Sequence, residues 1–272
     1  LAEQSKALST TREALRDSES QARKQASYLS DLTRRLGAAE AEADTAKTTL
    51  LRTMSHELKT PLNAILGFAD LLRLSADRFS SDQISEYSGL IHQAGGNLLK
   101  LINQILDLTK IAANRFPLRR RALPAGAALW AAADTHMSRA TEKNIAIAIA
   151  DTETDLLVDA DEGALATMLG QLVENAVTFT QPGGHVRVAA IRDGLVVRFT
   201  IEDDGPGVGA EDLVRVQQPF EQVGRSTTDH TNGAGLGLPL VQGLAELHGG
   251  RLVIASALGE GFTATVELPA AG

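Results

Sequence analysis

The sequence predicts an α+β protein built from three successive parts. A seven-residue repeat over residues 1–46 predicts a coiled coil, because apolar residues at this spacing form one seam along a helix. Two longer helical patterns over residues 47–114 predict a helical hairpin that forms a four-helix bundle with a second copy. Strand-like runs alternating with helical patterns over residues 115–272 predict an α/β sandwich.

The coiled coil rests on a repeat that contains almost no helix-breaking residue. The first 50 residues lack proline, and Leu or Ala recurs at every seventh position from Leu1 to Leu50. Many residues at the second seam position are polar or small, Gln4 and Ser18 among them, so a single solvated helix stays an alternative. The repeat ends at Leu50 whereas the next seam begins at Leu51, so the two registers differ by one residue. A continuous helix must be locally over- or underwound at this junction to satisfy both.

The predicted hairpin carries apolar stripes that are too wide for one pair of helices to bury. Apolar residues recur at spacings of three and four from Leu51 to Leu72 and again from Ile91 to Ala112, with a turn-like segment, residues 75–82, between them. A second stripe consists of Leu62, Leu66, Leu99, Ile102 and Leu106. Two hairpins bury both stripes in a four-helix bundle, so we expect a homodimer.

Beyond Phe116-Pro117, five short β-like runs predict strands. They are residues 145–150, 185–190, 195–202, 251–255 and 262–268. Residues 161–180 and 236–248 have helical patterns, and Gly249-Gly250 predicts the end of the second helix. Hairpins and helices in this order predict one mixed sheet covered by helices.

Composition and charge exclude several classes of protein. The 272 residues include no cysteine, which excludes disulfide scaffolds, zinc ribbons, Fe–S ligation and thiol catalysis. Residues 141–272 carry 7 basic and 19 acidic side chains, a net charge of −12. Such a domain is a poor nucleic-acid binder, because that interaction depends on Lys and Arg. A polyanion would have to be held by a metal ion and by backbone N–H groups.

The chain is expected to be a fragment that works in the cytoplasm. The absence of cysteine fits a reducing compartment, and no apolar run approaches the ~20 residues that a spanning helix needs. The chain begins with Leu1 rather than methionine, so we expect upstream segments that include a sensory domain. A membrane anchor in the full-length protein stays open.

A histidine on the outer face of the first hairpin helix is the first candidate for chemistry. With Leu51 and Met54 in the seam, His56 faces outward, and Thr60 lies one turn further along. Glu57 can accept a proton from one ring nitrogen and leave the other as a neutral nucleophile. A lone helical histidine is more often structural or simply solvated, and that alternative stays open at this point.

Two further clusters lie in the C-terminal part. Gln171 and Asn175 are four residues apart on one helix face, and an amide oxygen suits Mg²⁺, which uses few protein ligands. Asp203 at a strand end can accept a hydrogen bond from an exocyclic amine, and Gly205 and Gly207 let the backbone approach a planar base. Each cluster alone also fits an ordinary surface helix or turn.

Glycines at the start of the last predicted helix provide an anion site. Gly233, Gly235 and Gly237 leave the first N–H groups of that helix unobstructed by side chains. Their spacing differs from that of Walker A and dinucleotide-binding motifs. The preceding residues 225–232 are small and polar, which is typical of a mobile lid.

The order of these clusters resembles that of the sensor histidine kinases of two-component signalling. The matching motifs, in family order and spacing, are the H box at residues 56–63, the N box ending at Asn175, the first G box at 203–207, the F box at 219–222 and the second G box at 233–238. The resemblance covers about residues 47–270. The glycine-rich run from Gly235 and the motif at residues 246–250 resemble the subgroup of alphaproteobacterial cell-cycle kinases.

This resemblance implies a dimerisation and histidine phosphotransfer domain at residues 47–114 and an ATP-binding catalytic domain at residues 115–272. His56 would accept the γ-phosphoryl group of ATP, with Glu57 as base, and pass it to an aspartate of a response regulator. Thr60 would orient water when the regulator is dephosphorylated, an activity that we also expect.

The resemblance also implies the residues that hold ATP and Mg²⁺. Asn175 would hold Mg²⁺ and Asp203 would bind the adenine amine. Phe179 would line the adenine pocket, and Arg225 would neutralise developing charge on the γ-phosphate. The glycines that surround the nucleotide would be Gly205, Gly207, Gly233, Gly235 and Gly237.

Three departures from the family pattern keep alternatives open. Gln171 replaces the usual Asn, Thr178 replaces a phosphate-contacting Lys, and Val223 replaces a larger residue after the F box. Loss of that Lys favours slow autophosphorylation, so a phosphatase-biased protein or a pseudokinase scaffold is the alternative. An ATP-hydrolysing relative of the gyrase or chaperone type is disfavoured, because Gln171 occupies the position of its water-activating Glu and cannot act as a base.

Overall fold

The computed structural model describes residues 51–74, 79–150, 155–221 and 234–271. By internal contacts the chain divides into two compact units, Leu1–Ser55 and His56–Gly272. The predicted coiled coil at residues 1–46 lies outside the described residues, as do Arg225, Gly233 and Val223. The predicted domain boundaries stay predictions.

Two long helices form the predicted hairpin. The first covers residues 51–74 without interruption at Pro61. The second, α2 (Ser81–Ala112), begins at a capping box in which Ser80 Oγ accepts from the Gln83 N–H and Gln83 Oε1 accepts from the Ser80 N–H. Near the turn, the ring of Tyr87 stacks on that of Phe68, with their centroids 5.8 Å apart. This contact fixes the two helices against each other close to their connection.

One of the two predicted apolar stripes stays exposed in the single hairpin. Its residues are between 40 and 61% exposed, and they are Leu62, Leu66, Leu99, Ile102 and Leu106. A contiguous apolar surface of this kind on a soluble helix indicates an interaction face. The exposure agrees with the argument that one hairpin cannot bury both stripes.

The C-terminal part is built on a five-stranded mixed sheet in the order β2-β4-β5-β7-β6. The strands are β2 (Ala146–Ile149), β4 (His185–Asp193), β5 (Val196–Asp203), β6 (Arg251–Ser256) and β7 (Phe262–Pro269). Only the β2–β4 pair is parallel, and the other neighbours are antiparallel. All five predicted strands are therefore confirmed, and their ends shift by at most three residues.

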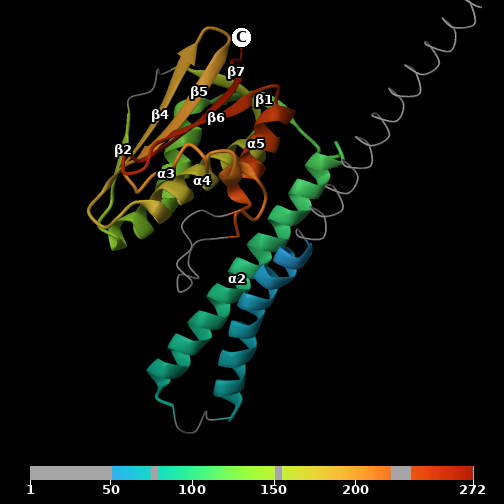
Figure 1. The fold of residues 1–272 in the computed structure, drawn as a ribbon, viewed down its shortest axis with the longest axis vertical. Coiled ribbons are helices and arrows are strands. Elements are labelled where there is room, and N and C mark those ends of the chain that lie inside the picture. The colour runs from blue at the N-terminus through green and yellow to red at the C-terminus, as the bar shows by residue number, and fades with distance from the viewer. Residues whose placement is uncertain (1–50, 75–78, 151–154, 222–233, 272) are drawn as a thin grey trace, which may run out of the picture. The chain divides into compact units, whose positions relative to one another are not determined.

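Three helices gather on one side of this sheet (Figure 1), and they are α3 (Ala125–Glu142), α4 (Glu162–Phe179) and α5 (Gly237–Leu247). The core lies between the helices and the sheet. Alternate residues of β5 point into it, so Val197 and Phe199 are fully buried whereas Arg198 between them is partly exposed. The α/β sandwich predicted from the sequence is confirmed.

A second, smaller sheet corrects the prediction of a single mixed sheet. Strands β1 (Arg120–Pro124) and β3 (Leu157–Asp161) pair in antiparallel fashion, with Arg120 opposite Asp161. Neither strand was predicted, because each has only five residues and carries charged side chains among its apolar ones. Helix α3 was also missed, since Pro124 and Gly126 interrupt the apolar run that contains its first residues; Pro124 in fact serves as its N-cap.

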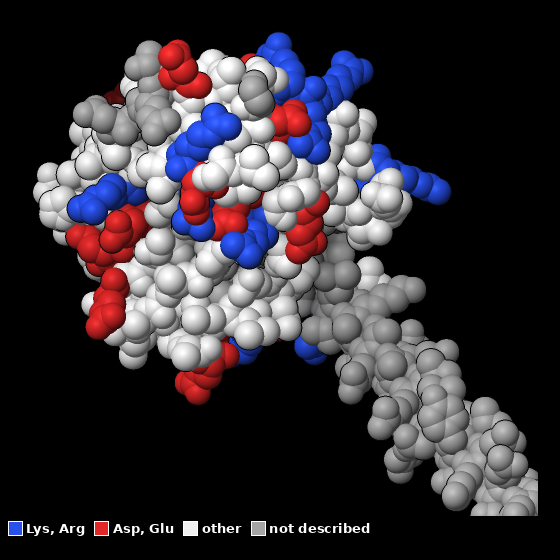
Figure 2. Space-filling model, turned by 90° about the horizontal axis from the view of Figure 1, so that it is seen from above, with Lys and Arg blue, Asp and Glu red and all other residues white. Residues whose placement is uncertain are grey.

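The sheet face away from the helices carries charged side chains paired across strands. Glu267 of β7 accepts from Arg198 Nε at 3.0 Å and from Arg251 Nε at 2.6 Å. Basic and acidic side chains alternate over the face that Figure 2 shows. On this face the strongly negative net charge of residues 141–272 is not gathered in one acidic patch.

None of the helices in the described ranges combines the length and apolar character that a membrane crossing requires.

We predict that Phe199→Ala destabilises the C-terminal part by about 3–5 kcal/mol, the usual cost of truncating a fully buried phenylalanine. Phe199 is 0% exposed, so its removal leaves a cavity between β5 and the helices. Urea denaturation measures the loss. Leu195→Ala is the matched control, because Leu195 lies in the turn between β4 and β5 and is 86% exposed. This substitution should change the free energy of unfolding by less than about 0.5 kcal/mol. Equal losses in the two variants would contradict this account of the core.

Candidate functional site

His56 is exposed on the first helix and contacts its neighbour Glu57. The His56 side chain is 72% exposed, and its Nδ1 lies 3.4 Å from Glu57 Oε1. The Glu57 side chain is only 17% exposed, so the helix holds the carboxylate in place. With Nδ1 directed at the carboxylate, Nε2 is the ring nitrogen that an incoming reactant can reach.

Thr60 lies one helical turn beyond His56, as its spacing predicted. Its Oγ1 donates to the backbone carbonyl of His56 at 3.2 Å. The hydroxyl is exposed and close to the backbone of the histidine, but it does not contact the ring.

Helix α4 presents Gln171 and Asn175 to the start of α5. A Cβ atom added to Gly237, the first residue of α5, would lie 3.0 Å from Gln171 Oε1 and 3.6 Å from Asn175 Nδ2. The two amides and the free N–H groups of the α5 N-terminus therefore border one site. The resemblance implied that Asn175 and Gly237 both surround the nucleotide, and that assignment stays a prediction.

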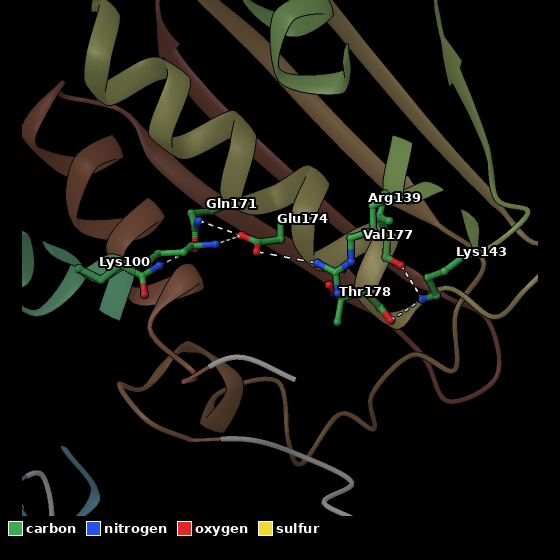
Figure 3. Close-up of polar contacts among 8 residues, drawn as sticks. Lys100, Arg139, Lys143, Gln171, Glu174, Val177 and Thr178 are labelled. Carbon is green, nitrogen blue, oxygen red and sulfur yellow. Dashed lines mark hydrogen bonds and ion pairs between the residues drawn. The ribbon is translucent and has the colours of Figure 1, made fainter. Parts of the chain in front are cut away.

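Gln171 also belongs to a polar network that links α4 to α2 and α3 (Figure 3). Gln104 Nε2 of α2 donates to Gln171 Oε1 at 2.8 Å, and Gln171 Nε2 donates to Glu174 Oε2 at 3.1 Å. Lys100 of α2 forms an ion pair with Glu174, and Arg139 Nη1 of α3 lies 4.0 Å from Glu174 Oε1. Glu174 is thus held by cations and by an amide rather than directed at the start of α5.

Asp203, the last residue of β5, is a buried carboxyl group that is 7% exposed. Its Oδ1 accepts a hydrogen bond from the Gly205 N–H at 2.9 Å. Burial raises the pKa of Asp203 to about 6; the hydrogen bond from Gly205 opposes this, and the neighbouring Asp204 adds to it. A perturbed carboxyl at a strand end is typical of a functional position.

Close backbone contacts around Asp203 require glycine. A Cβ atom at Gly205 would lie 2.8 Å from Asp203 Oδ1 and 3.0 Å from the Phe179 carbonyl oxygen. Gly207 has φ +62°, and its Cβ would lie 2.1 Å from the Ala257 carbonyl oxygen. In the fold these glycines admit close contacts with the protein's own backbone. The predicted approach of backbone to a planar base stays a prediction.

The F box and the second G box meet in the described residues. The Phe220 N–H donates to the Gly235 carbonyl oxygen at 3.0 Å. Gly235 has φ +68°, and a Cβ there would lie 2.8 Å from the Glu221 carbonyl oxygen. These contacts place the F box directly against the segment that leads into α5.

The C-terminal end of α4 carries contacts that sequence reasoning missed. Phe179 is the last residue of α4 and is 42% exposed, and its backbone carbonyl lies next to the Asp203–Gly205 turn. Lys143 Nζ, from the residue that ends α3, donates to the carbonyls of Val177, Thr178 and Thr180 at 2.7, 2.8 and 3.0 Å (Figure 3). Nothing in the local sequence connects residues more than 30 positions apart.

The N-terminal end of α4 is held by a histidine that was also missed. His248 is fully buried, and its Nε2 accepts from the Asp161 N–H at 3.0 Å while its Nδ1 donates to the Leu244 carbonyl at 2.7 Å. Asp161 in turn caps α4, because its Oδ1 accepts from the Ala164 N–H. The role of His248 is therefore structural.

Comparisons with known families match both parts of this arrangement. Residues 46–114 match the family described as His Kinase A (phospho-acceptor) domain. Residues 160–272 match the family described as Histidine kinase-, DNA gyrase B-, and HSP90-like ATPase. The chain belongs to the sensor histidine kinases.

Curated relatives agree with this family. The chain is 43% identical over 231 residues to Histidine protein kinase DivJ of Caulobacter vibrioides, which covers 85% of this chain and 38% of that protein. It is 42% identical over 234 residues to an uncharacterized sensor-like histidine kinase of Rhizobium meliloti, covering 85% and 45% of the two. The chain thus spans less than half the length of these relatives. The likeness to DivJ is in line with the subgroup expected from the sequence.

Solved structures agree on the fold. Full-length ShkA in complex with AMPPNP has a TM-score of 0.61 and 35% identity, and the match covers 81% of this chain and 45% of that chain. The histidine kinase ThkA in complex with the response regulator protein TrrA has a TM-score of 0.62 and 19% identity, and the match covers 85% and 64%. At that identity the second likeness shows the fold alone.

Two departures of this histidine kinase from the family pattern have a structural account. A glutamine side chain is one methylene longer than asparagine, and Gln171 uses its amide to contact both Gln104 of α2 and Glu174. At Thr178, where the family usually has a lysine, the backbone carbonyl accepts from Lys143 instead. Lys143 uses its donors on carbonyls, so it does not replace the missing phosphate contact.

We predict that Asp203→Asn abolishes nucleotide binding but stabilises the C-terminal part. Asparagine keeps an oxygen for the Gly205 N–H but removes the buried charge. Because the folded protein raises the pKa of Asp203 to about 6, keeping it ionised above that pH lowers the free energy of unfolding. We expect the substitution to raise the free energy of unfolding by up to about 2 kcal/mol at neutral pH. This is somewhat less than the free energy that corresponds to a pKa shift of about two units.

The sign of the pH dependence provides the check. The wild-type protein regains this stability as the pH falls through about 6, and below about pH 4 the carboxyl is protonated in both the folded and the unfolded state. Thermal melts of both proteins at several pH values should therefore converge in acid. A constant difference at every pH, or unchanged calorimetric ATP affinity in the variant, would contradict the assignment.

Proposed function

We propose that this chain is an ATP-dependent histidine autokinase that phosphorylates His56 and transfers the phosphoryl group to an aspartate of a response regulator. The observation that carries the proposal is the exposed His56 ring with its Nδ1 directed at Glu57, in a segment that matches the phospho-acceptor family. An ATPase-type domain in the same chain supplies the donor site.

The chemistry at His56 follows from this contact. Glu57 accepts a hydrogen bond from Nδ1–H and raises the basicity of the ring, so that Nε2 carries a lone pair. Nε2 attacks the γ-phosphorus of ATP, a nitrogen–phosphorus bond forms, the bond between the γ-phosphorus and the β–γ bridging oxygen breaks, and ADP leaves. Glu57 stabilises the positive charge that develops on the ring.

The residues at the nucleotide site suit ATP and Mg²⁺. No cluster of three or more His, Cys, Asp or Glu side chains in the described ranges could hold a metal by itself. An amide oxygen of Asn175 beside the α5 N-terminus fits Mg²⁺, which takes its remaining ligands from phosphate and water. When bound, this ion neutralises charge on the phosphates.

The adenine end is assigned to Asp203 and Phe179. An ionised Asp203 accepts a hydrogen bond from the exocyclic amine of adenine, and the exposed Phe179 ring packs against the base. Thr180 Oγ1 is buried with no partner among the described residues, so it is a further polar group available at this end. Gly205, Gly207, Gly235 and Gly237 with Gly233 keep side chains out of the nucleotide's path, and Arg225 acts on the γ-phosphate.

The hairpin is proposed to dimerise and to bind the regulator. The exposed stripe over residues 62–106 supplies the apolar surface of a four-helix bundle with a second copy. The receiver domain of the regulator must bring its aspartate to His56, which is accessible on the outer face. We also propose that the same face dephosphorylates the regulator, with Thr60 orienting water.

A second candidate is a phosphatase-biased protein or a pseudokinase scaffold with weak kinase activity. The observation that favours it is Thr178, because the phosphate-contacting lysine usual at this position is absent from a negatively charged domain. An ATP hydrolase is disfavoured by Gln171, which cannot act as a base, and by the engagement of Glu174 with Lys100 and Arg139.

We predict that His56 is the sole phosphoacceptor. With ATP labelled in the γ-phosphate, the wild-type protein should acquire a label that is labile in acid and stable in base, whereas His56→Ala should acquire none. His92→Ala is the matched control, because His92 is also exposed on the hairpin but has no acidic neighbour in sequence. Acid-labile label on His56→Ala would overturn the assignment, and inorganic phosphate released without labelling would favour the hydrolase.

Thr60 is predicted to act in dephosphorylation only. Thr60→Ala should slow dephosphorylation of the regulator by at least about tenfold, because its hydroxyl no longer orients water. Labelling of His56 should stay unchanged, since Thr60 contacts the backbone and not the ring. Thr60→Ser keeps the hydroxyl and should retain both activities. An equal loss of both activities in Thr60→Ala would mean that the residue supports His56 itself.

A further inference from the structure

We propose that Lys143 is a positioning residue for the adenine end of the nucleotide site, an inference that rests on the proposed function. It lies outside every motif by which the sequence was assigned, 32 residues before Asn175. Its ammonium group holds the last turn of α4, the helix that carries both Asn175 and Phe179.

The ammonium group makes one hydrogen bond with each of its three N–H donors. The acceptors are the backbone carbonyls of Val177, Thr178 and Thr180, at 2.7 to 3.0 Å. An ammonium has three donors and no acceptor, so its hydrogen-bonding capacity is used in full at this place. Because each donor has an acceptor, Lys143 makes a specific contact, whereas a solvated surface lysine near a helix end leaves its donors to water.

Helix α4 needs this external cation at its C-terminal end. The last carbonyls of a helix lack partners within the helix and carry a partial negative charge. The last turn of α4 contains no basic residue of its own, and Thr180, which ends the helix, is extended at φ −62° and ψ 136°. Lys143 reaches it from the end of α3, where its half-buried stem is held by the turn before β2.

The three carbonyls flank Phe179, and that residue touches the Asp203 turn. A Cβ atom at Gly205 would lie 3.0 Å from the Phe179 carbonyl oxygen, so the backbone of α4 and the Asp203–Gly205 turn are already in contact. Any displacement of the last turn of α4 therefore moves the Phe179 ring relative to the Asp203 carboxyl. Those two groups are the ones assigned to the adenine base.

Partial burial of Lys143 agrees with this role. Desolvation lowers the pKa of Lys143 from its usual value, and the neighbouring Arg139 adds to the effect. A cation is kept in such a position only where hydrogen bonds compensate for lost water. The three carbonyls provide that compensation.

The test replaces the ammonium without shortening the side chain. Lys143→Met keeps the stem and removes all three donors, and Lys143→Arg keeps the charge but presents a planar group. Lys110→Met is the matched control, since Lys110 is an exposed lysine whose ion pair within the described residues is with Asp107, one turn away on the same helix. The whole chain is used, folding is verified by circular dichroism, and affinities for ATP and ADP are measured by calorimetry.

We expect Lys143→Met to weaken ATP and ADP binding alike, by about tenfold, the value of one hydrogen bond to a charged group. The ratio of the two affinities should stay unchanged, because the adenine end is common to both nucleotides. The labelling rate at saturating ATP should also stay close to that of the wild type. Lys143→Arg should recover part of the affinity, and Lys110→Met should bind as the wild type does.

Hydrogen exchange provides a readout that separates positioning from simple destabilisation. Amides of residues 176–182 should exchange faster in Lys143→Met, while amides in the core of β5 should not. A folded Lys143→Met with wild-type affinity would overturn the proposal and leave only a helix cap, as would weaker binding without faster exchange at 176–182. If Lys143→Met does not fold, Lys143→Arg and Lys143→Gln take its place. Wild-type nucleotide affinity in both of these variants would then overturn the proposal.

The proposed function fails separately from this inference. A wild-type protein that binds no ATP would refute the nucleotide site itself, whatever Lys143 does. Wild-type binding with an unaffected Lys143→Met would refute the positioning role alone.

Discussion

The burial of one face of α4 against the sheet is the constraint on which the candidate site depends. Eight residues of this helix are buried, namely Ala164, Leu165, Met168, Leu169, Leu172, Val173, Ala176 and Val177. Each large apolar side chain of this set contributes about 1.5–3 kcal/mol on burial. Together they fix the rotation of α4 about its own axis. Gln171 and Asn175 must therefore face the start of α5, and Phe179 must end the helix beside the Asp203 turn.

Polar contacts at both ends of α4 fix its position along the helix axis, which burial of its apolar face leaves less well determined. Apolar packing fixes the rotation of a helix more firmly than its position along the axis, because neighbouring apolar residues can substitute for one another after a small slide. The Asp161 cap, which His248 holds in place, sets the first turn, and Lys143 sets the last. Directional hydrogen bonds at the ends thus determine the axial position. A helix held at both ends in this way suits the proposed role of its surface in binding a rigid ligand.

The sequence was sufficient where the information is local. Strand alternation located the five strands of the main sheet. The glycines near Asp203 and at Gly237 were assigned from the resemblance, because atoms that require them, such as the Ala257 carbonyl oxygen for Gly207 and Gln171 Oε1 for Gly237, are distant in sequence. The sequence was insufficient where the partner is distant. Lys143 meets carbonyls 34 or more residues away, and Gln104 meets Gln171 67 residues away. No periodicity records such contacts. Helix α3 and strands β1 and β3 were missed for a different reason, since short or proline-interrupted elements take their stability from the core they join rather than from their own pattern.

The contacts between α2 and the catalytic part have a different energetic character from those inside it. Gln104–Gln171 and Lys100–Glu174 join side chains that are only partly buried, and such contacts contribute about 1 kcal/mol or less each. Apolar contacts add to these, since Leu108 and Ile111 pack partly buried against the core, and a Cβ at Gly243 of α5 would lie 2.8 Å from Ile111 Cγ2. A few contacts of this size hold a defined arrangement yet separate at a free-energy cost far below that of unfolding either part. The proposed phosphoryl transfer to His56 and from it to a regulator would require the histidine to meet two different active groups in turn. A junction of partly buried side chains, with Gln171 and the apolar Leu108 and Ile111 among them, is compatible with that requirement, whereas a fully buried apolar interface would not be.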